Sequence, residues 1–303
     1  MIKNLLLGIL LISGFALAQE QSTEVKQDTL KNWSIQGQNT IMLNQAAFSN
    51  WIGGGANNIG WIAGVNYNMT YEKGNDLWEN IVILGTDNNT EGLGTRKTQD
   101  IINLSTNYGK KISKSWYVSG GASLLTQFAP GYADGNNPAA AKISNFMAPG
   151  YVNVGAGFTY RPSDNFTMTL RPANARWTFV LDKDLQYAGN YGLKNNGDSS
   201  LFQFGFLGTA IYKVKLMENI TLVNSASVFS NYLDHPDRLV LSYGGVLNMK
   251  INKYISSVIT LDVLYDHNQI WKTQLKQTLG LGLAYNIDNG LKRSENKNNQ
   301  TWK

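Results

Sequence analysis

The chain has 303 residues, of which 43% are hydrophobic, 11% aromatic and 16% charged, and it contains no cysteine. This charged fraction lies below the roughly 25% of ordinary soluble domains, and the lack of cysteine excludes disulfides. The formal net charge of +5 is a small excess over this length, so it gives no reason to expect a nucleic-acid partner.

The first eighteen residues have the three regions of a secretory signal peptide. Lys3 supplies a positive region, an apolar run extends from Leu5 to Phe15, and Ala16-Leu17-Ala18 forms a cleavage site of the A-x-A type. The apolar run is shorter than the roughly 20 residues that a membrane-spanning helix needs. We therefore expect residues 1–18 to be removed on export. Residues 19–32 are polar and lack periodicity, which indicates a short tether.

From Trp33 onward, apolar residues recur with a period of two, the period of a β-strand. The clearest case is Ile59 to Tyr71, where apolar or aromatic residues alternate with Gly, Asn and Thr, Ile62 being the exception. Similar alternation occurs in 152–160, 255–265 and 275–285. The second face is small and polar but poor in Lys and Glu. A soluble sandwich also alternates, but this composition favours a closed barrel whose apolar face meets lipid.

The connections between these strands predict a count of twelve and an orientation. Five connections are short: 72–76, 110–115, 161–165, 215–219 and 252–253. Six are longer or looser: 47–56, 87–96, 129–145, 182–199, 233–238 and 266–272. They alternate, as short periplasmic turns and longer extracellular loops do in outer-membrane barrels. We therefore predict an all-β, up-and-down antiparallel membrane-spanning barrel over residues 33–287. The tether at 19–32 and the polar tail at 288–303 then lie in the periplasm.

Two segments fit the pattern less well. Pro172 interrupts a long candidate strand, Phe166 to Leu181, where proline suits an edge or a bulge. An extra hairpin within residues 173–199 would raise the strand count to fourteen. Glu79 and Asn80 fall on opposite faces of the strand at 77–85, which predicts a bulge or a mixed environment.

Aromatic residues recur at the strand ends next to the short connections. They are Tyr71, Trp78, Tyr108, Trp116, Tyr160, Phe166, Tyr212, Tyr254 and Tyr285. Aromatics favour strands in any case, but their recurrence at the same end indicates a periplasmic girdle at one membrane interface.

Six motifs spread along the mature chain carry a family resemblance. They are NWIGGGANN from Asn50, RKTQD from Arg96, KSWYVSGGASLLTQFAPGY from Lys114, APGYVNVGAGFTYRPSDNF from Ala148, SNYLDHP from Ser230 and NMKINKYIS from Asn248. Together they resemble a family of outer-membrane proteins from Bacteroidota known as domain of unknown function 3078, over about Trp33 to Asn286. The resemblance implies an outer-membrane β-barrel and supplies no catalytic residues.

The glycine-rich stretch SNWIGGGANN, residues 49–58, raises the question of phosphate binding. A phosphate loop needs a lysine after its glycines and a following helix, whereas a strand pattern follows this stretch. We interpret it as an extracellular hairpin tip. Trp51, Gly53, Gly54 and Gly55 are candidate loop contacts, either folded over the barrel mouth or presented to a partner. A flexible loop without chemistry of its own is the alternative.

Few charged residues fall on the inward face by parity: Glu79, Arg171, Lys250, Asp262 and Lys276. Such residues either line an ion path or pair with one another and fill a narrow barrel. His235 and His267 fall in different loops without a metal-binding spacing, so neither a metal nor a cofactor is expected. Ser230 near His235 suggests a phospholipase-like enzyme as a distant alternative, but a catalytic pair is defined by geometry.

The sequence therefore predicts an outer-membrane barrel, not an enzyme, for passive or selective transport of small solutes. A structural or assembly subunit of a larger outer-membrane complex is the alternative. The expected partners are outer-membrane lipid and envelope proteins that contact the extracellular loops or the periplasmic tail.

Overall fold

The computed structural model describes residues 32–46, 58–91, 94–132, 140–188, 190–252, 254–267 and 270–288. The expected signal peptide, the tether up to residue 31, the loop with Trp51 and its glycines, and the tail from residue 289 lie outside the described residues.

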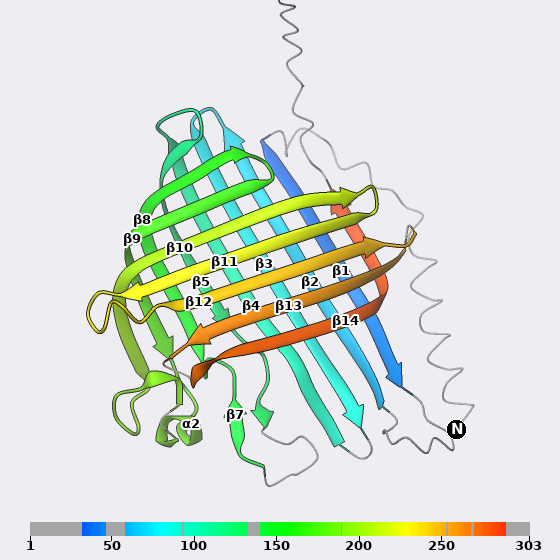
Figure 1. Ribbon diagram of the computed structural model, residues 1–303, viewed down its shortest axis with the longest axis vertical. Helices are drawn as coiled ribbons and strands as arrows, with labels where there is room; N and C mark the ends of the chain where they lie inside the picture. Colours follow the sequence, from blue (N-terminus) through cyan, green and yellow to red (C-terminus); the bar gives the residue numbers. More distant parts are fainter. Residues whose placement is uncertain are drawn as a thin grey trace, which may run out of the picture. The chain divides into compact units, whose positions relative to one another are not determined.

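Twelve antiparallel strands form a closed barrel (Figure 1). They are β1 (Trp33–Ala46), β2 (Asn58–Lys73), β3 (Asp76–Glu91), β4 (Gly94–Lys111), β5 (Trp116–Thr126), β8 (Gly150–Ser163), β9 (Phe166–Phe179), β10 (Ser200–Met217), β11 (Ile220–Asn231), β12 (Val240–Lys250), β13 (Ile255–Asp266) and β14 (Ile270–Asp288). Each strand pairs with its neighbours in chain order, and β1 pairs with both β2 and β14. The predicted twelve-stranded barrel is confirmed.

The alternation seen in the sequence places the apolar side chains on the outside. In β14, Leu279 is 65% exposed and Leu283 is 52% exposed, whereas Gly280 and Ala284, which follow them on the other face, are buried. A water-soluble fold does not leave so much contiguous apolar surface uncovered, so the barrel is membrane-spanning and this face meets lipid. In the described part of the chain, no helix is long and apolar enough to cross a membrane.

The connections define two ends of the barrel. The short-turn end has the connections at 74–75, 112–115, 164–165, 218–219 and 251–254, and the long-loop end has the other six. Two of the six predicted long loops, those at residues 87–96 and 266–272, are wrong. β3 runs on to Glu91 and pairs with residues 94–99 of β4, and β14 starts at Ile270, close after Asp266. Hydrogen bonds between strands satisfy the backbone N–H and C=O groups whatever the side chains are. Polar segments can therefore extend these two hairpins as strands.

The described parts of two long connections, residues 127–132, 140–149, 180–188 and 190–199, form a structured unit that we call the loop platform. It contains β6 (Gly131–Tyr132), β7 (Lys142–Ser144), α2 (Lys183–Tyr187) and the 3-10 turn η1 (Asn190–Gly192). A small core of Ala148, Val180 and Leu185 joins the two connections. These elements take the place of the extra hairpin considered for residues 173–199, so the count of fourteen is wrong.

A bulge in β9 changes which face its residues occupy. The register with β8 and with β10 shifts on either side of Pro172, because β9 carries an additional residue there. The proline has no N–H to donate, so a bulge accommodates it. Before the bulge Arg171 faces inward, and after it Asn174 and Arg176 face inward as well. The predicted bulge at Pro172 is thus present, whereas β3 pairs regularly through residues 77–85.

Candidate functional site in the barrel lumen

Polar side chains reach across the interior between strands that are not neighbours. Arg176 of β9 approaches Asp266 of β13, although β10, β11 and β12 separate these strands in the sheet. Lys213 of β10 donates to the Oε1 atom of Gln36 on β1, at 3.2 Å. Both contacts cross the lumen, so the interior is narrow at these two levels.

At the short-turn end, Arg161 is surrounded by carboxylates. Its guanidinium lies 3.0 Å from Asp164, 3.8 Å from Glu72 and 3.9 Å from Glu79, and its side chain is mostly buried. Glu72 and Glu79 belong to β2 and β3, which lie across the lumen from β8. Opposite charges at these distances attract strongly where water is partly excluded, so this cluster ties the two walls together.

Towards the long-loop end, the guanidinium of Arg176 lies between two aromatic rings. Its Cζ atom is 5.0 Å from the ring centre of Tyr151 and 4.9 Å from that of Phe229. Its Nη2 atom is 4.0 Å from the carboxylate of Asp266, which is buried. A cation held against two ring faces is attracted by both. Arg176 is therefore held by two aromatic rings and, in addition, by one carboxylate.

Between these two levels, Arg171 lies in a buried polar cluster without acidic members. Its Nη2 atom donates to Oδ1 of Asn107 at 3.1 Å. The amide of Asn107 donates in turn to the hydroxyl of Thr159, at 3.1 Å. Thr159 also bonds to the hydroxyls of Ser119 and Thr169. β4, β5, β8 and β9 all contribute to this cluster, which fills their side of the lumen.

The opposite side of the lumen carries exposed polar side chains. The inward-facing side chains of Gln36, Asn66, Asn68, Lys213, Ser225 and Asp262 are exposed. They lie on β1, β2, β10, β11 and β13, and they share the inward face with the hydrogen-bonded pair Gln38–Asn286. Exposed polar side chains inside a closed barrel indicate a water-accessible space along this wall.

The five charged residues predicted to line the lumen do not form one group. Glu79 lies near Arg161, and Arg171 belongs to the buried cluster. Asp262 and Lys276 lie directly opposite each other in the register of β13 and β14. Lys250 is exposed at the end of β12. The part that these five residues play in a solute path stays a prediction.

Sequence reasoning missed Arg161, Arg176 and Lys213. Arg161 was assigned to the turn 161–165, although β8 continues to Ser163. Arg176 has outward parity when it is counted directly from Arg171, and the bulge at Pro172 reverses that parity. Pro172 was therefore the signal that could have identified Arg176.

The predicted aromatic residues gather at the short-turn end, where the structure adds Trp33. Its ring centre lies 5.3 Å from that of Tyr71 and 5.6 Å from that of Trp78. Further contacts link Trp116 to Tyr160, Tyr160 to Phe166, and Phe166 to Tyr212. Tyr108, Tyr254 and Tyr285 are exposed at the same end. Their interfacial role stays a prediction.

Ser230 and His235 do not adopt the arrangement of a nucleophile and its base. The Ser230 hydroxyl donates to the carbonyl oxygen of Pro236 at 2.7 Å, and Nε2 of His235 lies 3.7 Å from Asp234. Within the described ranges, no three His, Cys, Asp or Glu side chains are grouped to hold a metal ion. The geometry thus gives no support to the lipid-hydrolase alternative.

An ion-pair cluster holds the loop platform together. Nζ of Lys142 lies 2.8 Å from Oδ2 of Asp182 and 2.8 Å from Oδ2 of Asp184. Asp182 also accepts from the amide of Asn145 and caps α2. The hydrogen bond from Lys142 lowers the pKa of Asp182 below its ordinary value, and the same bond raises the pKa of Lys142. Both groups are therefore charged at neutral pH.

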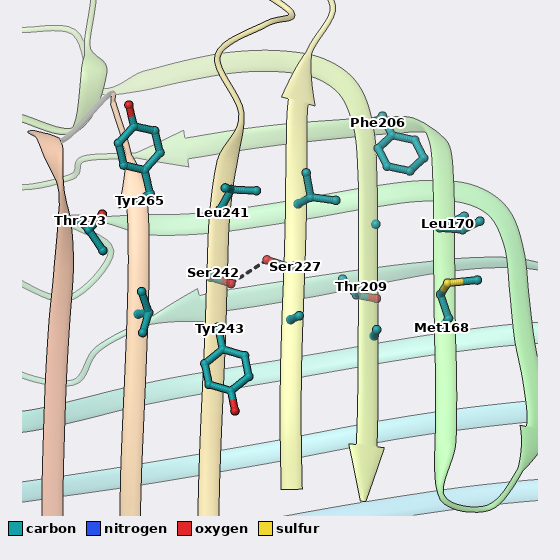
Figure 2. Close-up of a pocket in the computed structure, with 15 residues that line it drawn as sticks. Met168, Leu170, Phe206, Thr209, Ser227, Leu241, Ser242, Tyr243, Tyr265 and Thr273 are labelled. Atoms are coloured by element: carbon teal, nitrogen blue, oxygen red, sulfur yellow. Dashed lines mark hydrogen bonds between the residues drawn. The ribbon is translucent and has the colours of Figure 1, made fainter.

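A hollow of about 590 Å³ lies on the outer wall rather than in the lumen (Figure 2). Its lining includes the small residues Gly208, Ala210 and Ala226, and Leu170 and Leu241 stand on opposite sides of it (Figure 2). Small residues on two neighbouring strands, β10 and β11, create this depression. Because it is apolar and faces lipid, it suits a hydrocarbon chain, and it is not the candidate solute site.

The fold and its apolar outer face define the class of protein, a membrane-spanning β-barrel with a polar interior. Residues 43–132 match the family described as "Protein of unknown function (DUF3078)", which confirms the family resemblance over that part of the chain. No curated protein matches the chain.

Solved structures with a distant likeness include other barrels. The translocator domain of the autotransporter NalP from Neisseria meningitidis shares 15% identity, with 90% of this chain and 96% of that chain covered and a TM-score of 0.34. The NanC porin shares 14% identity, with 82% and 98% covered and a TM-score of 0.37. An outer-membrane channel from Pseudomonas putida F1 shares 11% identity, with 84% and 94% covered and a TM-score of 0.36. These likenesses are too distant to indicate what the lumen binds, which depends on this chain's own side chains.

Proposed function

We propose that this chain is a bacterial outer-membrane barrel that lets small polar solutes pass through its lumen. The observation that carries the proposal is the exposed polar wall formed by β1, β2, β10, β11 and β13, with residues such as Asn66, Asn68 and Ser225. Polar groups that face a water-filled space need no protein partner. In the proposed orientation in the outer membrane, the short-turn end faces the periplasm, as in other outer-membrane barrels.

The side chains that cross the lumen set the size of the solute. The bridge from Lys213 to Gln36 and the contact of Arg176 with Asp266 restrict the open space near the two ends. The passage therefore suits small solutes and ions rather than chains or folded proteins. Both contacts are made by side chains alone, so a single substitution removes either one.

Single-channel conductance of the purified, folded protein in a planar bilayer tests this proposal. We expect steady, protein-dependent steps, and larger steps for Lys213→Ala because the bridge to Gln36 is lost. Lys250→Ala is the matched control, since Lys250 is an inward lysine near the same end whose side chain has no hydrogen bond across the lumen to a described residue. Silence from protein that is demonstrably folded would overturn the proposal. Equal steps for the two variants would show that the bridge does not restrict the path.

A second candidate function, a subunit of a larger envelope complex, is favoured by the surface of the loop platform. Phe146 is 53% exposed and Tyr187 is 67% exposed, although the platform around them is held by ion pairs and a small core. Exposed apolar side chains on a structured loop are typical of binding surfaces. Co-purification of a partner at stoichiometric yield in mild detergent, abolished by Tyr187→Ser, would support it.

A further inference from the structure

The three arginines of β8 and β9 differ in their electrostatic partners. Arg161 has carboxylates at 3.0–3.9 Å, and Arg176 has Asp266 at 4.0 Å. Among the described residues, Arg171 has no carboxylate within 4 Å, and the bond from its Nη2 atom to Asn107 is the one hydrogen bond of its side chain. Its Nε atom is buried and has no partner. Arg171 is thus a cation in the middle of the lumen wall whose charge no described acidic side chain balances.

The surrounding wall accommodates this side chain closely. A Cβ atom at Gly121 of β5 would overlap Nη2 of Arg171, and one at Gly155 of β8 would lie 3.1 Å from its Cδ atom. Arg171 is 8% exposed, and its inward position directs that remaining surface to the lumen. Asn107, Ser119, Thr159 and Thr169 already bond to one another or to Arg171. The cluster is therefore a built, neutral setting around a single guanidinium.

A buried charge without a counter-charge is costly, because the protein interior solvates it poorly. The cost falls when an anion from solution occupies the neighbouring space. A guanidinium also offers planar N–H groups that suit carboxylates.

We propose that Arg171 is a binding point for small monovalent anions in the lumen, either chloride or the carboxylate of a small organic solute. This inference deepens the proposed solute passage and rests on it. Anions that pass along the lumen exchange part of their hydration water for Arg171, and a single cationic binding point of this kind favours anions over cations in transit.

Binding is tested first without any requirement for conduction. Chloride NMR line broadening is measured with the folded protein in detergent micelles, and potassium acetate is added as a competitor. We expect broadening with the unmodified protein, its loss in Arg171→Gln, and its retention in Arg171→Lys and in the control Lys194→Gln, which removes an exposed lysine of the loop platform. Suppression by acetate would assign carboxylates to the site as well, and no suppression would restrict it to chloride. Equal broadening for the unmodified protein and Arg171→Gln would overturn the proposal.

If Arg171→Gln does not fold, Asn107→Asp provides a second test. The new carboxylate would stand at the position of Oδ1, which is 3.1 Å from Nη2 of Arg171. It would supply the missing counter-charge from within the protein, so chloride broadening should disappear. Undiminished broadening in folded Asn107→Asp would contradict an anion site at Arg171.

The reversal potential in a potassium chloride gradient then separates this inference from the proposed function. Anion preference that shifts towards cations in Arg171→Gln but not in Lys194→Gln supports both. Conductance without anion preference, together with chloride broadening that does not depend on Arg171, leaves the passage standing and overturns the anion site. Chloride broadening that depends on Arg171, without any conductance, would support the anion site and overturn the proposed passage.

Discussion

At the scale of single residues, neighbouring glycines in β5 have different roles because they face opposite sides. Gly121 faces the lumen, where a Cβ atom would overlap the carbonyl oxygen of Thr106 and the guanidinium of Arg171. Gly120 faces outward, and a Cβ atom there would meet nothing closer than the carbonyl oxygen of Gly155, at 3.7 Å. The requirement for glycine is therefore steric at one position and weak at the next.

This difference predicts that Gly121→Ala destabilises the barrel more than Gly120→Ala. Overpacking against a backbone atom costs about 1–3 kcal/mol, whereas an added methyl group on the lipid face costs little. The midpoint of urea unfolding in detergent micelles, followed by tryptophan fluorescence, measures both variants. Equal midpoints would contradict the close contact between β5, β4 and Arg171.

At the scale of elements, β9 places the lumen arginines through one additional residue. Without the bulge at Pro172, Arg171 and Arg176 would occupy opposite faces, because side chains alternate along a strand. With it, Arg176 reaches Tyr151 and Phe229 inside, while Trp177 faces outward and contacts Phe202, with ring centres 5.2 Å apart. The one additional residue in β9 thus determines which of the side chains after Pro172 face the lumen.

Deletion of Pro172 is therefore expected to prevent folding, whereas Pro172→Ala should fold. The deletion would turn Arg176 to lipid, which costs up to about 2–4 kcal/mol at the membrane midplane and less towards the interface where Arg176 lies. It would also turn Trp177 into the lumen and reverse the faces of the residues beside it. Heat-modifiable migration on gels reports the folded fraction of each variant. A deletion variant that folds as well as Pro172→Ala would show that the register adjusts elsewhere.

At the scale of the whole molecule, the barrel could be predicted from sequence because membrane strands alternate with a strict period. Twelve such segments and their pairing follow from local patterns in stretches such as residues 275–285. The extended hairpin of β3 and β4 could not be predicted, since its end, from Asp87 to Glu91, is polar and resembles a loop. The loop platform depends on contacts such as Lys142 with Asp182, forty positions apart.

The candidate site was less predictable than the fold. Arg171 follows from parity alone, but its lack of an acidic partner depends on which strands face each other across the lumen. The bridge from Lys213 to Gln36 joins residues 177 positions apart on β10 and β1, and no local pattern records such a contact. Barrel shape, and not strand composition, brings these side chains together.

The depth of the whole barrel in the membrane supplies the last prediction. Because the chain contains no cysteine, single cysteines can be placed at will and spin-labelled. Tyr108 and Leu104 lie on the outward face of β4, four residues apart, and Tyr108 is nearer the short-turn end. At about 3.3 Å per residue and a tilt of roughly 40°, their depths should differ by about 10 Å. We expect the label of Tyr108→Cys to be more accessible to a polar nickel reagent and that of Leu104→Cys to be more accessible to oxygen. The opposite order would contradict an aromatic girdle at this interface.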